Sequence, residues 1–249
     1  MPQDFPHENL EVYAHALSFA KFAAALIDSW PAVFAVCDQL DRATESIVTN
    51  LAKAARLHAT QNRIHCLECS LGSVLECAAC LDVAHRRHLV VAAPLHEAKQ
   101  MLQRIARMEV GLRQSWGCLK EEAESYGTNA NPYFLHESLV VYQRSLQVHE
   151  ALDELWESER KRERYTRRID ELSTSLTINI AEGNGRFSKV DHSKFVSIAE
   201  DAGTKLAAYL DLAAAALMKS DAAKACLREV MAMLGGLRGY LESDGCGGT

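Results

Sequence analysis

The segment Asn179-Ile180-Ala181-Glu182-Gly183-Asn184-Gly185-Arg186-Phe187-Ser188 predicts a tight turn between two helices. Apolar residues recur at helical spacing on both sides of it, at Leu172, Leu176 and Ile180 before the turn and at Val190, Phe195, Ile198 and Ala202 after it. Gly183 and Gly185 can adopt positive φ without a Cβ penalty, so we expect them to end the first helix. Ser188, with Asp191 three residues later, predicts the N-cap of the second helix.

The turn also carries a carboxylate, Glu182, and a guanidinium, Arg186. We expect the two to pair with each other or with neighbouring helix ends and so to pin the turn. A second interpretation, compatible with the first, is that they bind a partner. Two close glycines also suggest a phosphate-binding loop, but such a loop follows a strand and ends in Gly-Lys-Ser/Thr, and this segment has neither feature.

The composition favours an all-α protein. The chain has 249 residues, of which 48% are hydrophobic and only 5 are Pro, a length that accommodates one large domain or two small ones. The net charge of −6 provides no overall attraction to nucleic acid, so nucleic-acid binding would require a local basic surface.

The N-terminal sequence favours a cytoplasmic protein. The apolar run 14–27 is interrupted by His15 and Lys21, and no basic segment precedes it, so we expect neither a signal peptide nor a membrane span. The chain contains 8 Cys, and without a secretion signal we expect reduced thiols.

The sequence repeats itself at an offset of 129 residues. Residues of the first half that recur in the second are Phe5, His7, Glu8, Tyr13, Asp41, Ser46, Asn50, Leu81 and Asp82, which correspond to Phe134, His136, Glu137, Tyr142, Asp170, Ser175, Asn179, Leu210 and Asp211. A single register held over that length predicts a tandem duplication.

Each unit is expected to form four helices. The expected ranges are 8–28, 33–57, 60–88 and 95–124 in the first unit, and 137–160, 163–182, 188–218 and 221–242 in the second. Short connections favour antiparallel neighbours, which predicts two tandem antiparallel up-down four-helix bundles. The predicted domains are residues 1–125 and 134–249, joined by a linker of turn-forming residues at 126–133.

Four cysteines, Cys66, Cys69, Cys77 and Cys80, have the paired spacing of a zinc site. On one continuous helix, however, the two pairs lie about 12–16 Å apart, too far for one ion to bridge. Their counterparts in the second unit, Phe195, Ile198, Leu206 and Tyr209, are core-type residues. We therefore expect the thiols to pack in the core and no metal to be bound. The alternatives are a kink that folds the helix back and a site shared between chains.

A basic segment precedes the second helix of the second unit. It comprises Arg160, Lys161, Arg162, Arg164, Tyr165, Arg167 and Arg168, whereas the first unit has the apolar run 31–36 at this place. The cations could hold phosphates, with Tyr165 stacking on a base. The alternative is an ordinary solvated helix end, balanced by Glu157, Glu159 and Glu163.

The motif Asn-Ile-Ala-Glu-Gly-x-Gly-Arg-x-Ser of residues 179–188, followed by an apolar helix, resembles the signature of a bacterial four-helix-bundle family. That family includes proteins encoded in ribosomal RNA intervening sequences and the accessory variability determinant of diversity-generating retroelements. The resemblance implies a bundle that works beside a reverse transcriptase and its RNA. This chain departs from those relatives because it is acidic and contains two fused units, of which only the second retains the motif.

The resemblance and the basic segment together predict a non-catalytic adaptor that binds RNA or a nucleic-acid enzyme such as a reverse transcriptase. Its expected contact residues are those of the basic segment together with Glu182 and Arg186. We expect self-association, and no cofactor, membrane or small-molecule substrate; the sequence also lacks the Glu-x-x-His motif of di-iron bundles. The alternative is an interaction or oligomerisation module, part of a defence or mobile-element system, that binds no nucleic acid.

Overall fold

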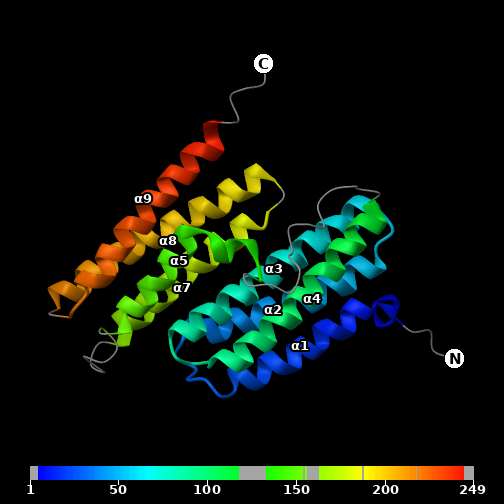
Figure 1. Ribbon diagram of the computed structural model, residues 1–249, viewed down its shortest axis with the longest axis horizontal. Helices are drawn as coiled ribbons and strands as arrows, with labels where there is room; N and C mark the ends of the chain where they lie inside the picture. The colour runs from blue at the N-terminus through cyan, green and yellow to red at the C-terminus, as the bar shows by residue number, and fades with distance from the viewer. Residues whose placement is uncertain are drawn as a thin grey trace.

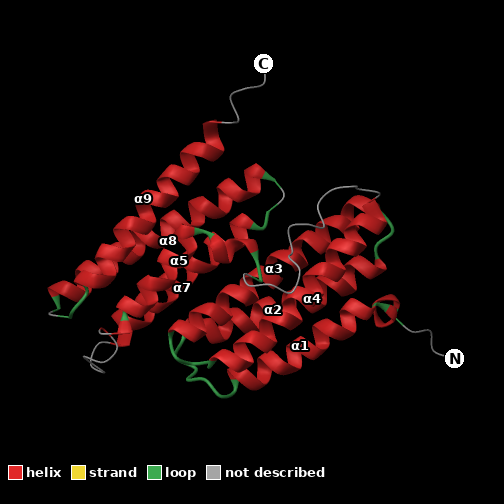
Figure 2. Ribbon diagram, viewed as in Figure 1, coloured by secondary structure: helices red, strands yellow, loops and turns green. Residues whose placement is uncertain are grey.

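The computed structural model describes residues 5–117, 133–153, 155, 163–186, 188–216 and 218–243. These residues form helices and no strand, which confirms the all-α prediction (Figure 2). In the first half they are α1 (Glu11–Ile27), α2 (Ala35–Arg56), α3 (Thr60–Arg86) and α4 (Ala92–Gly117). In the second half they are α5 (Val140–Ala151), α7 (Glu163–Asn184), α8 (Lys189–Ala215) and α9 (Asp221–Ser243).

The four helices of each half pack in the same cyclic order. In the first half α1 contacts α2 and α4, and α3 contacts α2 and α4. In the second half α5 contacts α7 and α9, and α8 contacts α7 and α9. Figure 1 shows the two groups as neighbouring bundles whose helices run side by side. The bundle arrangement therefore agrees with the expected architecture.

The helix bounds follow the offset of 129 residues. The short 3₁₀ helices Pro6–Asn9 and Leu135–Ser138 have this offset, as do α3 and α8 at both ends. Equivalent side chains also make equivalent contacts, since Asn50 donates to the carbonyl of Ser46 and Asn179 to that of Ser175. A tandem duplication predicts this recurrence; the duplication and the domain boundary of residues 126–133 stay predictions.

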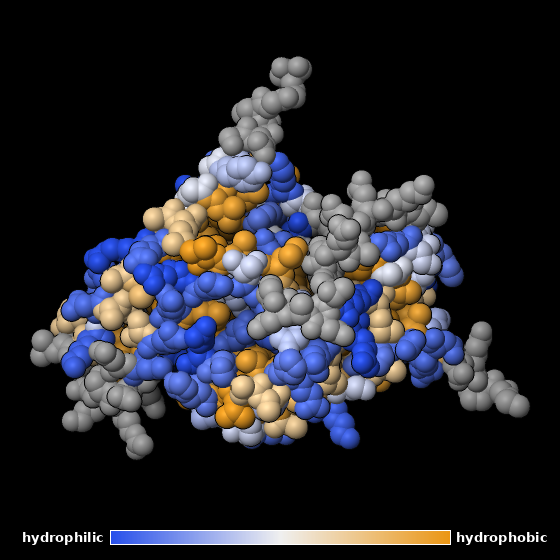
Figure 3. All heavy atoms as spheres, in the orientation of Figure 1, coloured by the Kyte–Doolittle hydropathy of each residue, from blue (hydrophilic) through white to orange (hydrophobic). Residues whose placement is uncertain are grey.

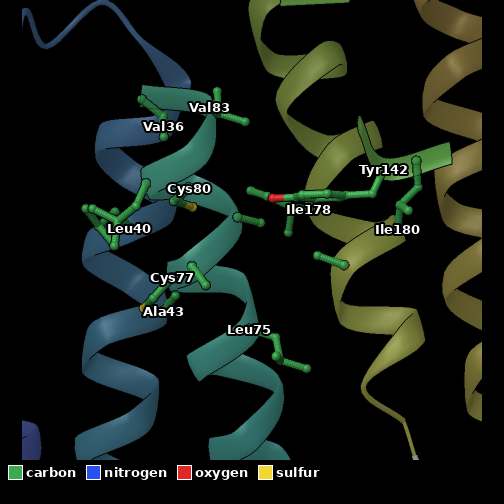
Figure 4. Packing of buried hydrophobic residues seen from close by; sticks show 14 of the residues in the cluster. Val36, Leu40, Ala43, Leu75, Cys77, Cys80, Val83, Tyr142, Ile178 and Ile180 are labelled. Atoms are coloured by element: carbon green, nitrogen blue, oxygen red, sulfur yellow. The ribbon is translucent and has the colours of Figure 1, made fainter. Parts of the chain in front are cut away.

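The two halves share one continuous core, and α3 lies at its centre. Every residue from Ser70 to Leu75 and from Cys77 to Leu81 is buried, because α3 packs against α2 and α4 on one side and against α7 and α5 on the other. Figure 4 shows this arrangement: α3 stands between α2 and the second half, with Leu75 and Val83 directed toward the latter. α3 is also long and apolar enough to cross a membrane by composition, but 72% of its most apolar window is buried inside the protein, as in a core helix.

Helix ends show where local prediction succeeds and where it fails. Ser188 caps α8 as expected, its hydroxyl accepting from the N–H of Asp191. At α2 the N-cap residue Phe34 contributes no side-chain bond; instead Asp170, from α7 of the other half, accepts from the N–H of Ala35 at 2.7 Å. One carboxylate thus satisfies an orphan helix donor across the boundary between the halves.

Two expectations about α8 are wrong. Val190 and Ile198 were assigned to its apolar face, yet they are 79% and 39% exposed. The buried residues of α8 form a single stripe because only its own bundle covers it. On the face shown in Figure 3, hydrophobic residues lie in small groups between hydrophilic ones.

Candidate functional site

The basic segment is described only from α7 onward. Arg160, Lys161 and Arg162 lie outside the described residues, and Arg164 is described only as part of the helix backbone. Tyr165 is half-buried, and the Arg167 and Arg168 side chains are 74% and 53% exposed. The first turns of α7 therefore present two guanidinium groups to solvent beside a tyrosine.

These two arginines share one acidic partner. Glu171 accepts from Arg167 at 3.1 Å and from Arg168 at 2.5 Å, in the i+4 and i+3 geometry of helix surface pairs. Arg168 also contacts the side chain of Tyr209 on α8. Glu171 thus balances this end of α7, in agreement with the alternative of a solvated helix end. Glu157, Glu159 and the side chain of Glu163 lie outside the described part of the chain.

A groove runs along this end of α7. One part lies between α7 and α8 and is lined by Val33, Tyr165, Arg167, Arg168, Glu171, Tyr209 and Leu212. A second hollow continues toward the N-terminus of α2 and adds Phe34, Asp38, Gln39 and Arg42. Sequence reasoning missed Tyr209, Leu212 and Arg42, because only the packing of α8 and α2 beside α7 brings them to the basic segment.

Glu182 and Arg186 lie at the opposite end of α7. Arg168 and Glu182 are separated by 14 residues of continuous helix, which is about 21 Å along the axis. The structure therefore does not bring the two predicted parts of the site together. Glu182 and Arg186 form an ion pair in which both side chains are largely buried, at 15% and 19% exposure. The guanidinium of Arg186 also lies 4.5 Å from the ring centre of Phe195, a cation–π contact.

The glycines of the motif act through close approach and not through a left-handed conformation. α7 ends at Asn184, directly before Gly185, as expected, but Gly183 lies inside the helix and neither glycine has the positive φ that was expected. A Cβ at Gly183 would lie 3.0 Å from that of Phe195, and a Cβ at Gly185 would overlap Leu75 of α3. The motif is therefore a packing corner where α7 meets α8 and α3.

The ion pair of the motif faces α3 and its titratable groups. Burial raises the pKa of Glu182, while Arg186 acts in the opposite direction. Burial and the nearby carboxylate of Glu182 raise the pKa of Glu76 to about 7, although Arg42 and Arg186 lower it. The arrangement supports the interpretation that Glu182 and Arg186 pin the turn between α7 and α8, on the side that faces α3.

The cysteines divide into two pairs. Cys77 and Cys80 are fully buried in the core, as expected, and burial raises the pKa of the Cys80 thiol far above its usual range. Cys66 and Cys69 are half-buried. Of their counterparts, Leu206 is buried, Phe195 and Tyr209 are half-buried and Ile198 is exposed, so the core assignment is only partly correct.

A cluster missed by sequence reasoning lies where the 3₁₀ helix Leu135–Ser138 meets α3 and α4. The ammonium of Lys99 lies 2.5 Å from Asp82 and 2.9 Å from Glu137. Ligand atoms of Asp82, His136 and Glu137 lie within 4.8 Å of one another, and Nε2 of the buried His136 has no hydrogen-bond partner among the described residues. These oxygen and nitrogen atoms could hold a divalent cation only if the ammonium of Lys99 moved away from the two carboxylates. The cluster is therefore a buried charge network between the halves.

The basic end of α3, His85-Arg86-Arg87-His88, is used within the protein. Arg86 pairs with Glu150 of α5, and the buried Arg87 donates to Asp170 at 3.1 Å and lies 3.7 Å from Asp153. These arginines hold the second half against the first.

Comparison with protein families gives one match. Residues 8–111 match the family described as 23S rRNA-intervening sequence protein. The matched segment covers most of the first half, from the first 3₁₀ helix into α4, and not the residues 179–188 on which the resemblance was first noted. Comparisons with curated proteins and with solved structures give no match. This match covers less than half of the chain, so residues 8–111 are similar to the 23S rRNA-intervening sequence protein family.

Proposed function

We propose that this protein is a non-catalytic adaptor that binds RNA through the basic end of α7. The observation that carries the proposal is the groove in which Arg167 and Arg168 lie exposed beside Tyr165 and Tyr209. Guanidinium groups contact phosphates and tyrosine rings stack on bases, which is the combination used by proteins that bind RNA. The family description, which refers to ribosomal RNA, supports the same class of partner.

The net charge of −6 requires the contact to be local. A groove that presents two arginines on one helix turn, at the junction of α7, α8 and the start of α2, meets that requirement. Glu182 and Arg186 take no part in this surface, because the ion pair is turned toward α3. Under this proposal the motif preserves the fold on which the basic end of α7 is displayed.

Binding of a structured ribosomal-type RNA hairpin with an unpaired loop, measured by electrophoretic mobility shift at about 50 and 200 mM salt, tests the proposal. We expect binding that falls steeply with salt, and a double variant Arg167→Ala, Arg168→Ala that binds at least about tenfold more weakly with a shallower salt dependence. Arg238→Ala is the matched control, since Arg238 is 50% exposed and paired with Glu200 at 3.1 Å but lies on α9, away from the groove. Absence of binding at the lower salt concentration would refute the proposal.

A second candidate is a protein interaction module, which the exposed apolar side chains of α8 favour. Val190, Ile198 and Leu212 are the exposed large apolar residues of that helix. Contact with a nucleic-acid enzyme such as a reverse transcriptase, or with another copy of the chain, would use such a surface. If the protein binds no RNA in the mobility-shift experiment, the interaction module is the function that remains.

A further inference from the structure

The two hollows beside α7 form one continuous groove, since both are lined by Val33, Arg167 and Glu171. The groove starts between Tyr209 of α8 and the first turns of α7. It crosses α7 at Arg167 and ends along the first turns of α2, beside Arg42. Residues of both halves line it, so the groove belongs to the pair of bundles and to neither bundle alone.

The part of the groove between α7 and α8 offers surface for the faces of bases. Tyr165 and Tyr209 are half-buried on facing helices, and the apolar side chains of Val33 and Leu212, exposed by 63% and 46%, complete the lining. A duplex keeps its base faces stacked inside and presents phosphates and 2′-hydroxyls, for which rings and apolar side chains are poor partners. An unpaired strand exposes base faces, which stack on aromatic rings regardless of sequence.

Cationic groups follow the groove along its length. Arg168 lies at the Tyr209 end, Arg167 at the crossing and Arg42 at the α2 end. Each has a carboxylate partner on its own helix: Glu171 serves both α7 arginines, and Asp38 lies 3.0 Å from Arg42. The three guanidinium groups and Asp38 are solvent-exposed, and Glu171 is 29% exposed, so the pairs are weak. A phosphate can replace the carboxylate as the partner of a guanidinium.

We propose that this groove binds an unpaired RNA strand, with bases against Tyr165 and Tyr209 and phosphates against Arg42, Arg167 and Arg168. The inference rests on the proposed function and specifies its ligand as single-stranded. Glu171 and Asp38 hold the guanidinium groups in place in the free protein and compete with the phosphates of the strand. Removing the charge of Glu171 therefore strengthens binding.

The test measures fluorescence anisotropy of the full chain with a labelled oligouridine of about 12 nucleotides and, separately, with a blunt RNA duplex carrying a similar number of phosphates. We expect the single strand to bind at least about tenfold more tightly than the duplex. Tyr209→Ala should weaken single-strand binding about fivefold or more, whereas Tyr209→Phe, which keeps the ring, should bind like the unmodified protein. Glu171→Gln should raise the affinity several-fold, a gain that a damaged fold does not produce.

The outcomes separate the inference from the proposed function. Equal binding of strand and duplex, with Tyr209→Ala unchanged, would overturn the unpaired-strand inference and leave RNA binding in place. If Glu171→Gln binds the single strand with unchanged affinity, the idea that phosphates replace Glu171 as the partner of the two arginines is wrong. Binding of neither RNA at low salt would overturn both proposals.

Discussion

α3 and α8 occupy equivalent places in the two halves, yet they have very different surroundings. Both contact two helices of their own bundle, but only α3 is also covered by α5 and α7. The covered face of α3 includes Gly72, Leu75 and Val83, whereas the equivalent positions of α8 are Asp201, Thr204 and Leu212, all exposed. At two of the three positions a small or apolar residue of α3 thus stands where α8 has a polar one, and at the third both helices are apolar. The second buried face of α3 is a property of the pair of bundles.

The largest expected effect distinguishes the two helices at one equivalent position. Val83→Asp places a charge at a fully buried site between the halves and should reduce the free energy of unfolding by about 4 kcal/mol or more. Leu212→Asp, at the exposed counterpart, should change it by less than about 0.5 kcal/mol. Urea denaturation followed by circular dichroism measures both. Similar losses in the two variants would show that α8 is covered in solution as α3 is.

A second prediction concerns an acid that is buried in the first half and has an exposed basic counterpart, Arg238, in the second. Glu109 is completely buried. Ser70 donates to one of its carboxyl oxygens, and the other has no hydrogen-bond partner in the part of the chain that the structure describes. Burial raises its pKa from 4.5 to about 8, so the folded protein favours the protonated form. Its contribution to stability is fully present below about pH 4.5 and is lost as the pH rises toward 8.

Glu109→Gln keeps a neutral hydrogen-bonding group at this place. Relative to the unmodified protein it should change stability little near pH 5 and should add about 3 kcal/mol near pH 8. Denaturation curves at both pH values test this, and Arg238→Gln is the control for the exposed counterpart. If the free energy of unfolding depends on pH in the same way in Glu109→Gln and in the unmodified protein, burial does not raise the pKa of Glu109.

The same comparison shows what the sequence could predict. Helix positions, the offset of 129 residues and the Ser188 cap depend on residues close together in the chain, and periodicity and capping rules describe them well. Contacts between residues far apart in the chain have no local signal. The capping of α2 by Asp170, the covering of α3 by α7, and the approach of Tyr209 to Arg168 all join residues more than 40 positions apart.

The candidate site shows the same limit. Arg167, Arg168 and Tyr165 could be identified as a basic-aromatic group from the sequence, but the groove depends on Val33, Arg42 and Tyr209, contributed by other helices and loops. The sequence predicted a positive φ at the glycines of the motif, which the structure does not have. Their importance comes from neighbours in space, Leu75 and Phe195, and not from their own backbone conformation.

The smallest of the three effects tests that explanation at Gly185. Because its φ is not positive, alanine fits the backbone, and the lower entropy of the unfolded chain would by itself stabilise the protein by about 0.4–1 kcal/mol. A methyl group there would, however, overlap the side chain of Leu75 on α3. We therefore expect Gly185→Ala to cost about 1–3 kcal/mol in urea denaturation. The corresponding residue of the first half is Arg56, so no such restriction applies there.

Two further variants decide whether the overlap with Leu75 is the cause. Gly111 lies in α4 with no atom near the place of a Cβ, so Gly111→Ala should stabilise the protein by about 0.5–1 kcal/mol. In the Leu75→Ala background the overlap disappears, and Gly185→Ala should then be neutral or stabilising, with a coupling energy of about 0.5–3 kcal/mol. An equal loss from Gly185→Ala in both backgrounds would mean that the glycine is required by its own backbone, as the sequence first suggested, and not by the packing of α7 on α3.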